Sequence, residues 1–183
     1  MTTRVLGIDP SLTATGLALA AEDPITVALK PPAKLRGHHR LAWLLGEITD
    51  SGTARQAALI VIEGPSFGSQ AGQRGHHERA GLWWLVTHRL WALHIPYAVA
   101  PPAAVKRYAT GKGNAGKDDV LREVTKRFPW FSGGNDEADA LVLAAMGADH
   151  LGHPLTPMPA AHRAALAGVD WPPQPAHTQE ENR

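Results

Sequence analysis

The sequence predicts an α/β fold in which one mixed sheet is covered by helices on both faces. Three strand-like apolar segments come first, joined by turn-prone residues, and strand-like and helical segments then alternate. Consecutive strands followed by alternation with helices are typical of a mixed sheet that needs helical cover on each side. Hydrophobic residues make up 44% of the 183 residues and charged residues 19%, a balance that favours a packed core over global disorder.

The first three strands are predicted at residues 4–10, 15–21 and 25–30. The stretch PSLTA separates the first two segments, and Asp23-Pro24 marks the turn between the second and third. Pro31-Pro32 then ends the run, because proline cannot donate a hydrogen bond to a growing sheet. We therefore expect an antiparallel meander at the start of the chain.

The remaining segments alternate between strands and helices. The run AALIVIE at residues 57–63 is continuously apolar and β-branched, as in a strand buried on both faces, and a shorter strand is expected at 97–100. Asn135 is a natural N-cap for the alanine-rich helix that follows it. Helices are predicted at residues 35–48, 78–94, 102–108, 117–128, 135–150 and 160–167.

The chain divides at about residue 152. Residues 1–152 carry all the strands and long helices and are expected to form one domain. Residues 153–183 are rich in proline and are expected to form a C-terminal extension whose last dozen polar residues are disordered.

Composition excludes several classes of protein. The absence of cysteine rules out disulfide frameworks, thiolate zinc sites and cysteine nucleophiles. No apolar run reaches the length of a membrane span, and the polar start MTTRVLGIDP lacks the features of a signal peptide. We therefore expect a cytoplasmic protein with no membrane partner.

Four carboxylates occupy positions that suggest a metal site. Asp9 and Glu63 stand at the carboxyl ends of two predicted strands, where open α/β sheets form their ligand sites. Asp136 and Asp139 are three residues apart on one face of a predicted helix. Taken singly, solvent exposure explains each acid, and the helix dipole also explains Asp136. Taken together, they favour a hard cation such as Mg²⁺ or Mn²⁺.

Zinc is the weaker alternative for such a site. Without cysteine it would need clustered histidines, and the pairs His38-His39 and His76-His77 are adjacent in sequence. Adjacent residues do not face one another as residues four apart on a helix do.

Positive charge is concentrated in the middle of the chain. Residues 70–130 hold ten Lys and Arg against four acids, a net charge of +6, whereas the rest of the chain carries −5. This is either the footprint of a polyanion or a solvated helix surface, and charge alone favours the second interpretation.

Four motifs, taken in order, resemble those of the RuvC family of Holliday junction resolvases. They are GIDPSLTATG, VIEGPSF, PPAAVKRYATGKGNAGKDDV and NDEADALVLA, and the resemblance spans about residues 4–150. The first motif alone is also similar to the phosphate-binding turns of actin and sugar kinases. The third and fourth are much more specific.

The resemblance implies a fold and a chemistry. The fold would be ribonuclease H-like, a five-stranded mixed sheet in which a three-stranded antiparallel meander joins two parallel strands, with helices on both faces, and residues 1–152 would be the nuclease domain. The enzyme would be a crossover junction endodeoxyribonuclease that cleaves four-way DNA junctions with two Mg²⁺ ions, for which Mn²⁺ can substitute. The expected products carry 5′-phosphate and 3′-hydroxyl ends.

Residue roles follow by matching motifs. Asp9, Glu63, Asp136 and Asp139 would be catalytic metal ligands, Lys117 would act at the reacting phosphate or the DNA backbone, and Lys106 would contact DNA. Two further basic residues and one aromatic residue are also expected to contact DNA. The full set of expected DNA contacts is Phe67, Arg74, Lys106, Lys112 and Lys117.

Phe67 departs from the family pattern. It follows Glu63 by four residues rather than three, with Gly64-Pro65 between them, in a glycine-rich loop that extends to Gln73. Phe67 either stacks on bases at the branch point or anchors the loop on the core. The preferred DNA structure and cleavage sequence are therefore left open.

A tryptophan-bearing helix predicts a homodimer. Trp84 and Trp91 are seven residues apart and share one face of the helix expected at 78–94. We interpret this face as a subunit interface, because a two-fold symmetric junction suits a C2 dimer.

Three other functions are weighed against junction cleavage. An ATP-handling protein of the actin and sugar-kinase class would need further nucleotide-binding segments in a much longer chain. A non-catalytic binder of branched DNA would be expected to lack one of the four carboxylates, and all are present. A related nuclease acting on flaps, forks or other branched DNA remains the alternative.

Overall fold

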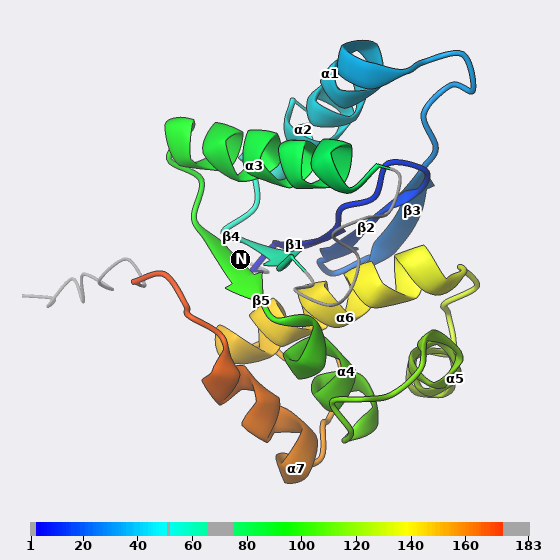
Figure 1. The fold of residues 1–183 in the computed structure, drawn as a ribbon. Helices are drawn as coiled ribbons and strands as arrows, with labels where there is room; N and C mark the ends of the chain where they lie inside the picture. Colours follow the sequence, from blue (N-terminus) through cyan, green and yellow to red (C-terminus); the bar gives the residue numbers. More distant parts are fainter. Residues whose placement is uncertain (1–2, 51, 66–74, 174–183) are drawn as a thin grey trace, which may run out of the picture.

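The computed structural model describes residues 3–50, 52–65 and 75–173, which form a three-layer α/β structure (Figure 1). The elements in chain order are β1 (Val5–Asp9), β2 (Thr15–Ala20), β3 (Ile25–Leu29), α1 (Gly37–Thr49), α2 (Gly52–Arg55), β4 (Leu59–Glu63), α3 (His76–Ala92), β5 (Tyr97–Ala100), α4 (Pro102–Thr110), α5 (Lys117–Arg127), α6 (Asn135–His150), α7 (Ala160–Arg163) and the 3₁₀ helix η1 (Ala164–Gly168).

The sheet has five strands in the order β3-β2-β1-β4-β5. The first three strands form an antiparallel meander, and β4 and β5 continue the sheet parallel to β1. The predicted mixed sheet is confirmed, including the burial of the AALIVIE segment, in which residues 59–62 are all buried.

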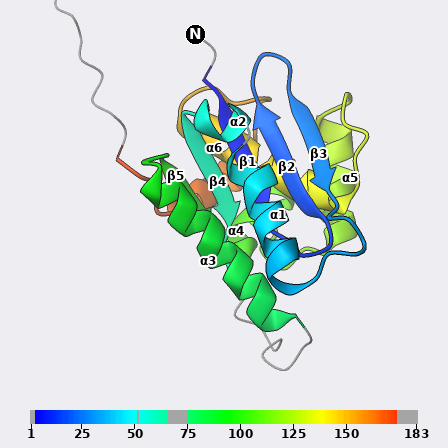
Figure 2. The same cartoon turned by 90° about the horizontal axis from the view of Figure 1, so that it is seen from above.

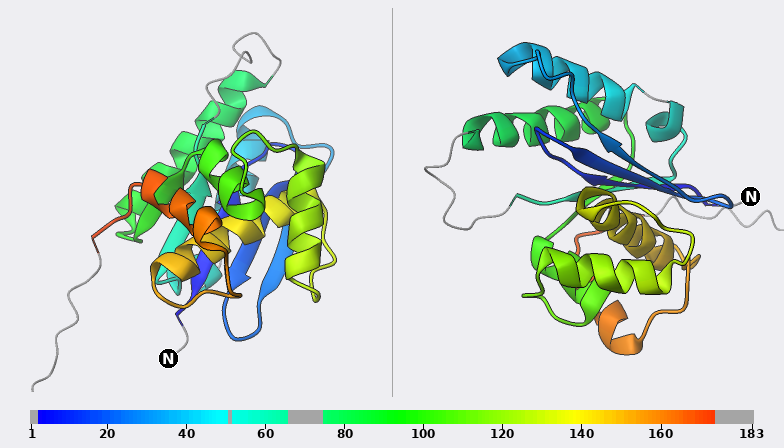
Figure 3. Two further views of the ribbon diagram at one scale, coloured as in Figure 1. Left: turned by 90° about the horizontal axis from the view of Figure 1, so that it is seen from below. Right: turned by 90° about the vertical axis from the view of Figure 1, so that its right-hand side faces the viewer.

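Helices cover both faces of the sheet. Helices α1 and α3 lie side by side on one face (Figure 2), and α6, α4 and α5 lie on the other (Figure 3). Because successive side chains of a strand point to opposite faces of the sheet, the strands contribute to two separate hydrophobic cores. Leu6 and Ile8 of β1 pack towards α1 and α3, whereas Val5 packs towards α6.

Helix α6 is the most buried helix of the described residues. From Ala138 to Asp149 its residues are buried, apart from the half-buried Asp139. Its small side chains explain how it lies between the sheet and two further helices, because alanine and glycine allow backbones to approach closely. A Cβ on Gly147 would lie 2.6 Å from Val5 Cγ1 and 2.7 Å from Val61 Cγ2.

Element ends differ from the predictions in understandable ways. The structure adds the short helix α2, which is too short for a periodicity signal. Asn135 is the first helical residue of α6 rather than its N-cap, a role that Gly134 takes with extended backbone angles. The Gly134 N–H donates to Glu137 Oε2 at 3.1 Å, so the glutamate side chain supports the helix start instead.

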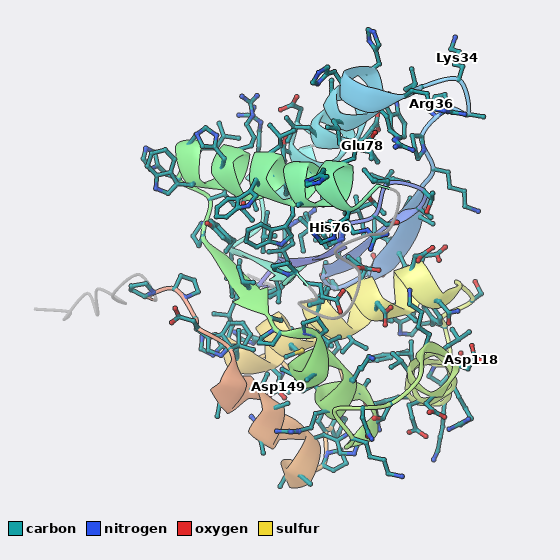
Figure 4. The ribbon with its side chains drawn as sticks, in the orientation of Figure 1. Lys34, Arg36, His76, Glu78, Asp118 and Asp149 are labelled. Carbon is teal, nitrogen blue, oxygen red and sulfur yellow. The ribbon has the colours of Figure 1, made fainter. Side chains whose placement is uncertain are left out.

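The C-terminal extension continues the core as far as the structure describes it. Ala165 and Val169 are buried among residues of α4 and α6, and the Trp171 ring stacks on His150 with a centroid distance of 4.1 Å. Asp149, labelled in Figure 4, has a fully buried side chain, which accepts hydrogen bonds from Tyr108 Oη and from Arg163 Nε. The domain division at residue 152 stays a prediction, and residues 174–183 lie outside the described part.

None of the helices in the described residues is long and apolar enough to cross a membrane.

Candidate functional site

A cavity of about 420 Å³ opens at the carboxyl ends of β1, β4 and β5. All four predicted carboxylates line it, as do two of the predicted lysines. The predicted residues at this cavity are Asp9, Glu63, Lys106, Lys117, Asp136 and Asp139. Residues far apart in the sequence therefore meet at one edge of the sheet.

Strand register brings the first two carboxylates together. Asp9 and Glu63 are the last residues of two neighbouring parallel strands, paired from Val5 and Leu59 up to Ile8 and Ile62. Parallel strands end at the same edge of a sheet, so their terminal side chains become neighbours. A side-chain hydrogen bond joins the two carboxyl groups.

Two glycines allow α6 to bring the other two carboxylates to the same edge. Gly16 on β2 pairs with Asp9, and a Cβ at Gly16 would lie only 1.9 Å from the Asp136 carbonyl oxygen. A Cβ at Gly7 would lie 2.1 Å from the Ala140 carbonyl oxygen. The first turns of α6 thus rest directly on the sheet backbone, which sets Asp136 and Asp139 beside Asp9.

Burial and mutual repulsion disfavour ionised carboxylates in this cavity. Burial raises the pKa of Asp9 and of Glu63 well above their ordinary values, and the negative charge of a neighbour adds to this. Asp139 also has a raised pKa because of burial, opposed by the positive charge of Lys117. A bound cation would act in the opposite direction, because a nearby positive charge favours the ionised form of a carboxyl group.

The lysines supply the opposing charge at the rim. Lys117, the first residue of α5, is 62% exposed, and its Nζ lies 4.0 Å from Asp139 Oδ2. Lys106 on α4 is half-buried and lines the same cavity. Its helix begins directly after β5, with Pro102 in its first turn.

Of the other predicted DNA contacts, Lys112 lies within the described residues. It is exposed in the loop between α4 and α5 and does not line the cavity. Phe67 and Arg74 lie outside the described residues, so their predicted roles stay predictions. Within the basic segment, Arg89 pairs with Asp50 and Arg122 with Asp119, so part of its charge is already neutralised.

Sequence reasoning missed the contribution of α3 to the cavity. His76, Arg79 and Trp83 line it from the first two turns of that helix, and Figure 4 shows His76 at the helix start. One signal was present in the sequence: the helix follows β4 after a single loop, so its start must return to the carboxyl edge of the sheet. The face that points inwards was not evident from the helical periodicity.

The donors in the cavity fit a hard divalent cation. They are carboxylate oxygens, the ligands that Mg²⁺ and Mn²⁺ prefer, and the histidine pairs weighed for zinc supply only His76 to the lining. As the side chains stand, no three His, Asp or Glu of the described residues are arranged to hold one ion. Ion binding therefore requires these carboxylate side chains to rotate.

Comparison with known proteins finds RuvC proteins among the relatives of this chain. No protein-family profile matches the chain. The crossover junction endodeoxyribonuclease RuvC of Rickettsia felis is 27% identical over 150 residues, which cover 76% of this chain and 94% of the relative. The corresponding protein of Rickettsia massiliae is 26% identical over the same length.

The fold comparison agrees. The Thermus thermophilus RuvC structure superimposes with a TM-score of 0.64 at 19% identity, covering 82% of this chain and 98% of the other. The same protein in complex with a Holliday junction substrate gives a TM-score of 0.63 at 20% identity, with coverage of 82% and 97%. Sequence and fold together confirm the resemblance: this chain is related to the RuvC family and shares its ribonuclease H-like fold.

Proposed function

We propose that the protein is a divalent-cation-dependent endonuclease that cleaves Holliday junctions. The observation that carries this proposal is the single cavity that gathers four carboxylates and two lysines at the carboxyl edge of the sheet. Support also comes from the relatives, which are named crossover junction endodeoxyribonucleases, one of them solved with a Holliday junction substrate.

Asp9, Glu63, Asp136 and Asp139 would hold two Mg²⁺ ions, for which Mn²⁺ can substitute. Asp9 is the most central of them, because it neighbours Glu63 on one side and the start of α6 on the other. When bound, such ions lower the pKa of a water molecule and neutralise charge on the phosphate oxygens during an in-line displacement. No protein nucleophile is then needed, and the products would carry 5′-phosphate and 3′-hydroxyl ends.

The lysines act on the substrate side of the cavity. Lys117 is exposed at the rim and close to Asp139, so its ammonium group can donate to a phosphate oxygen and stabilise charge that develops there. Lys106 is more enclosed and would hold the neighbouring backbone phosphate. Lys112, Arg74 and Phe67 complete the proposed DNA contacts, the last of them at the branch point.

A panel of DNA substrates tests the function. Mobile and immobile four-way junctions, three-way junctions, forks, flaps and linear duplexes should be incubated with the protein and Mg²⁺. We expect paired cuts in four-way junctions, and nicked products that DNA ligase reseals because their ends are 5′-phosphate and 3′-hydroxyl. Preferential cleavage of flaps or forks would support the alternative nuclease, and binding without cleavage in Mg²⁺ or Mn²⁺ would support a non-catalytic binder.

Junction binding should weaken steeply as salt rises. Each phosphate neutralised by a lysine contributes about −0.9 to the slope of log affinity against log salt for duplex DNA. Replacing Lys106, Lys112 or Lys117 with glutamine should therefore reduce the slope by about 0.9 each, measured by fluorescence anisotropy in EDTA so that no cleavage occurs.

Lys34 provides the matched control for this experiment. It is exposed in the loop between β3 and α1, away from α4 and α5 (Figure 4). Lys34→Gln should leave the salt slope unchanged. If all four variants behave alike, the basic segment is a solvated surface and does not contact DNA.

The homodimer remains a proposal, supported by the outer face of α3. Leu82, Val86 and Leu90 of this helix are buried against the sheet, whereas Trp84 and Trp91 are 68% and 66% exposed. Two large exposed aromatic side chains on one face are typical of a protein interface.

Substitution of these tryptophans should disrupt the dimer. Hot-spot aromatic residues contribute about 2 kcal/mol or more each, so Trp84→Ser with Trp91→Ser should weaken association at least about a thousandfold. Sedimentation equilibrium measures this directly. Trp130→Ser, which removes another exposed tryptophan, is the control. A monomeric wild type, both free and DNA-bound, would refute paired cleavage by a preformed dimer.

A further inference from the structure

We propose that Trp83 is a positioning residue that holds the carboxyl end of β4, and with it Glu63, in the geometry that the cations require. This inference rests on the proposed function of the cavity and adds a residue from α3 to it. The Trp83 indole Nε1–H donates to the Glu63 carbonyl oxygen at 2.9 Å, across twenty residues of sequence.

The end of β4 depends on this hydrogen bond because the sheet secures only one of its sides. On the β5 side, Glu63 pairs with Ala100, and the Gly64 N–H donates to the Ala100 carbonyl at 2.9 Å. On the β1 side, the pairing ends one residue earlier, at Ile62. The Glu63 carbonyl therefore lies just past that ladder, where the indole N–H takes the place of a strand donor.

Trp83 is itself held firmly in place. Its half-buried ring packs against the apolar cluster between the sheet and α3, and it meets the Trp84 ring edge-on at a centroid distance of 5.1 Å. The Thr87 hydroxyl donates to the Trp83 carbonyl at 3.0 Å. The ring also lines the cavity beside Glu63, so it both orients the strand end and forms an apolar wall of the site.

The hydrogen bond from Trp83 limits the positions that the Glu63 side chain can reach. The position of the Glu63 backbone determines which rotamers of its side chain reach into the cavity beside Asp9. Groups that orient metal ligands through hydrogen bonds change metal affinity by about 10–100-fold when they are removed. The Trp83 indole acts on the ligand through its backbone, so the lower end of that range applies.

The test compares two matched substitutions. Trp83→Phe removes the N–H and keeps an aromatic ring, whereas Trp130→Phe makes the same change at an exposed tryptophan that does not line the cavity. Thermal unfolding of each protein without DNA, titrated with Mg²⁺, reports cation binding independently of catalysis. We expect Trp83→Phe to raise the Mg²⁺ concentration at half-maximal stabilisation about tenfold, and Trp130→Phe to leave it unchanged.

Cleavage and DNA binding separate positioning from general damage. Trp83→Phe should require the same tenfold more Mg²⁺ for half-maximal cleavage, while junction affinity in EDTA stays at the wild-type value. Equal Mg²⁺ dependence of the two variants would overturn the role of Trp83 and leave the proposed function standing. A wild type that shows neither stabilisation nor cleavage with Mg²⁺ or Mn²⁺ would overturn the proposed function and this inference with it.

A measurement on the wild type keeps the inference testable if Trp83→Phe does not fold. The indole N–H resonances of Trp83, Trp91 and Trp130 can be assigned by NMR and followed during the Mg²⁺ titration. The Trp83 resonance should shift with the saturation of the site, and those of Trp91 and Trp130 should not. An unmoved Trp83 resonance in a protein that binds Mg²⁺ would overturn the proposed role.

Discussion

Asp9→Asn is expected to lower the rate of junction cleavage by at least about a thousandfold, which corresponds to about 4 kcal/mol of lost transition-state stabilisation. Asp9 is only 8% exposed and lies between Glu63 and the start of α6, so it would be the central ligand of the proposed cation site. Asparagine keeps the size of the side chain and removes the charge. Single-turnover cleavage in Mg²⁺ measures the effect.

The same variant should fold and bind junctions normally. Burial raises the pKa of Asp9, so the folded protein holds this proton more tightly than the unfolded chain does. The wild type without metal therefore loses stability as pH rises through the raised pKa, and Asp9→Asn should be at least as stable at neutral pH. Loss of a negative charge beside phosphate should leave junction affinity in EDTA equal or tighter.

Asp23→Asn is the control for this variant, because Asp23 is exposed in the turn between β2 and β3. It should cleave at the wild-type rate. Turnover of Asp9→Asn close to that of the wild type would remove Asp9 from the metal site.

Gly16→Ala is expected to reduce both stability and activity. The added Cβ would lie 1.9 Å from the Asp136 carbonyl oxygen and 2.6 Å from its carbonyl carbon, so the first turn of α6 must move away from β2. Overpacking of this kind typically destabilises by about 1–3 kcal/mol, and the backbone contact favours the upper end. Displacement of catalytic groups by about 1 Å can cost about a hundredfold in rate, and we expect that loss here because Asp136 and Asp139 move with the helix.

Gly46→Ala is the matched control, since its added Cβ would meet only the Asp50 side chain, at 3.8 Å, in a helix outside the cavity. Urea unfolding and single-turnover cleavage should show it to be as stable and active as the wild type, or slightly more stable because alanine favours helices. A Gly16→Ala protein with unchanged stability and rate would show that α6 does not depend on this close approach.

Much of the architecture could be predicted from local patterns. Continuous apolar runs and proline-marked turns predicted the five strands, because burial on one or both faces leaves a direct mark on composition. The spacing of Trp84 and Trp91 predicted that they share one face of α3, and both are exposed. The motif residues Asp9, Glu63, Asp136 and Asp139 were found because strand ends and helix starts could be located in the sequence.

Only the tertiary structure determines how closely two elements approach each other and where their side chains point. Gly16 lies against the Asp136 backbone because of the way α6 crosses β2. In the sequence alone, a glycine at this position indicates only a residue that weakens a strand. Trp83 lies on the same helix as two exposed tryptophans, and nothing in its spacing indicates a hydrogen bond to Glu63. Lys106 and Lys112 belong to one basic segment, yet only Lys106 lines the cavity.

The physical reason is the range of the interactions involved. Hydrophobic periodicity and turn chemistry act within a few residues, so the sequence by itself determined the strands, most of the helices and the residues at their ends. The raised pKa values of Asp9 and Glu63, the contact between α6 and the sheet, and the hydrogen bond from Trp83 all arise between segments that are distant in the chain. Only the packed fold sets those distances, and through them the chemistry of the site.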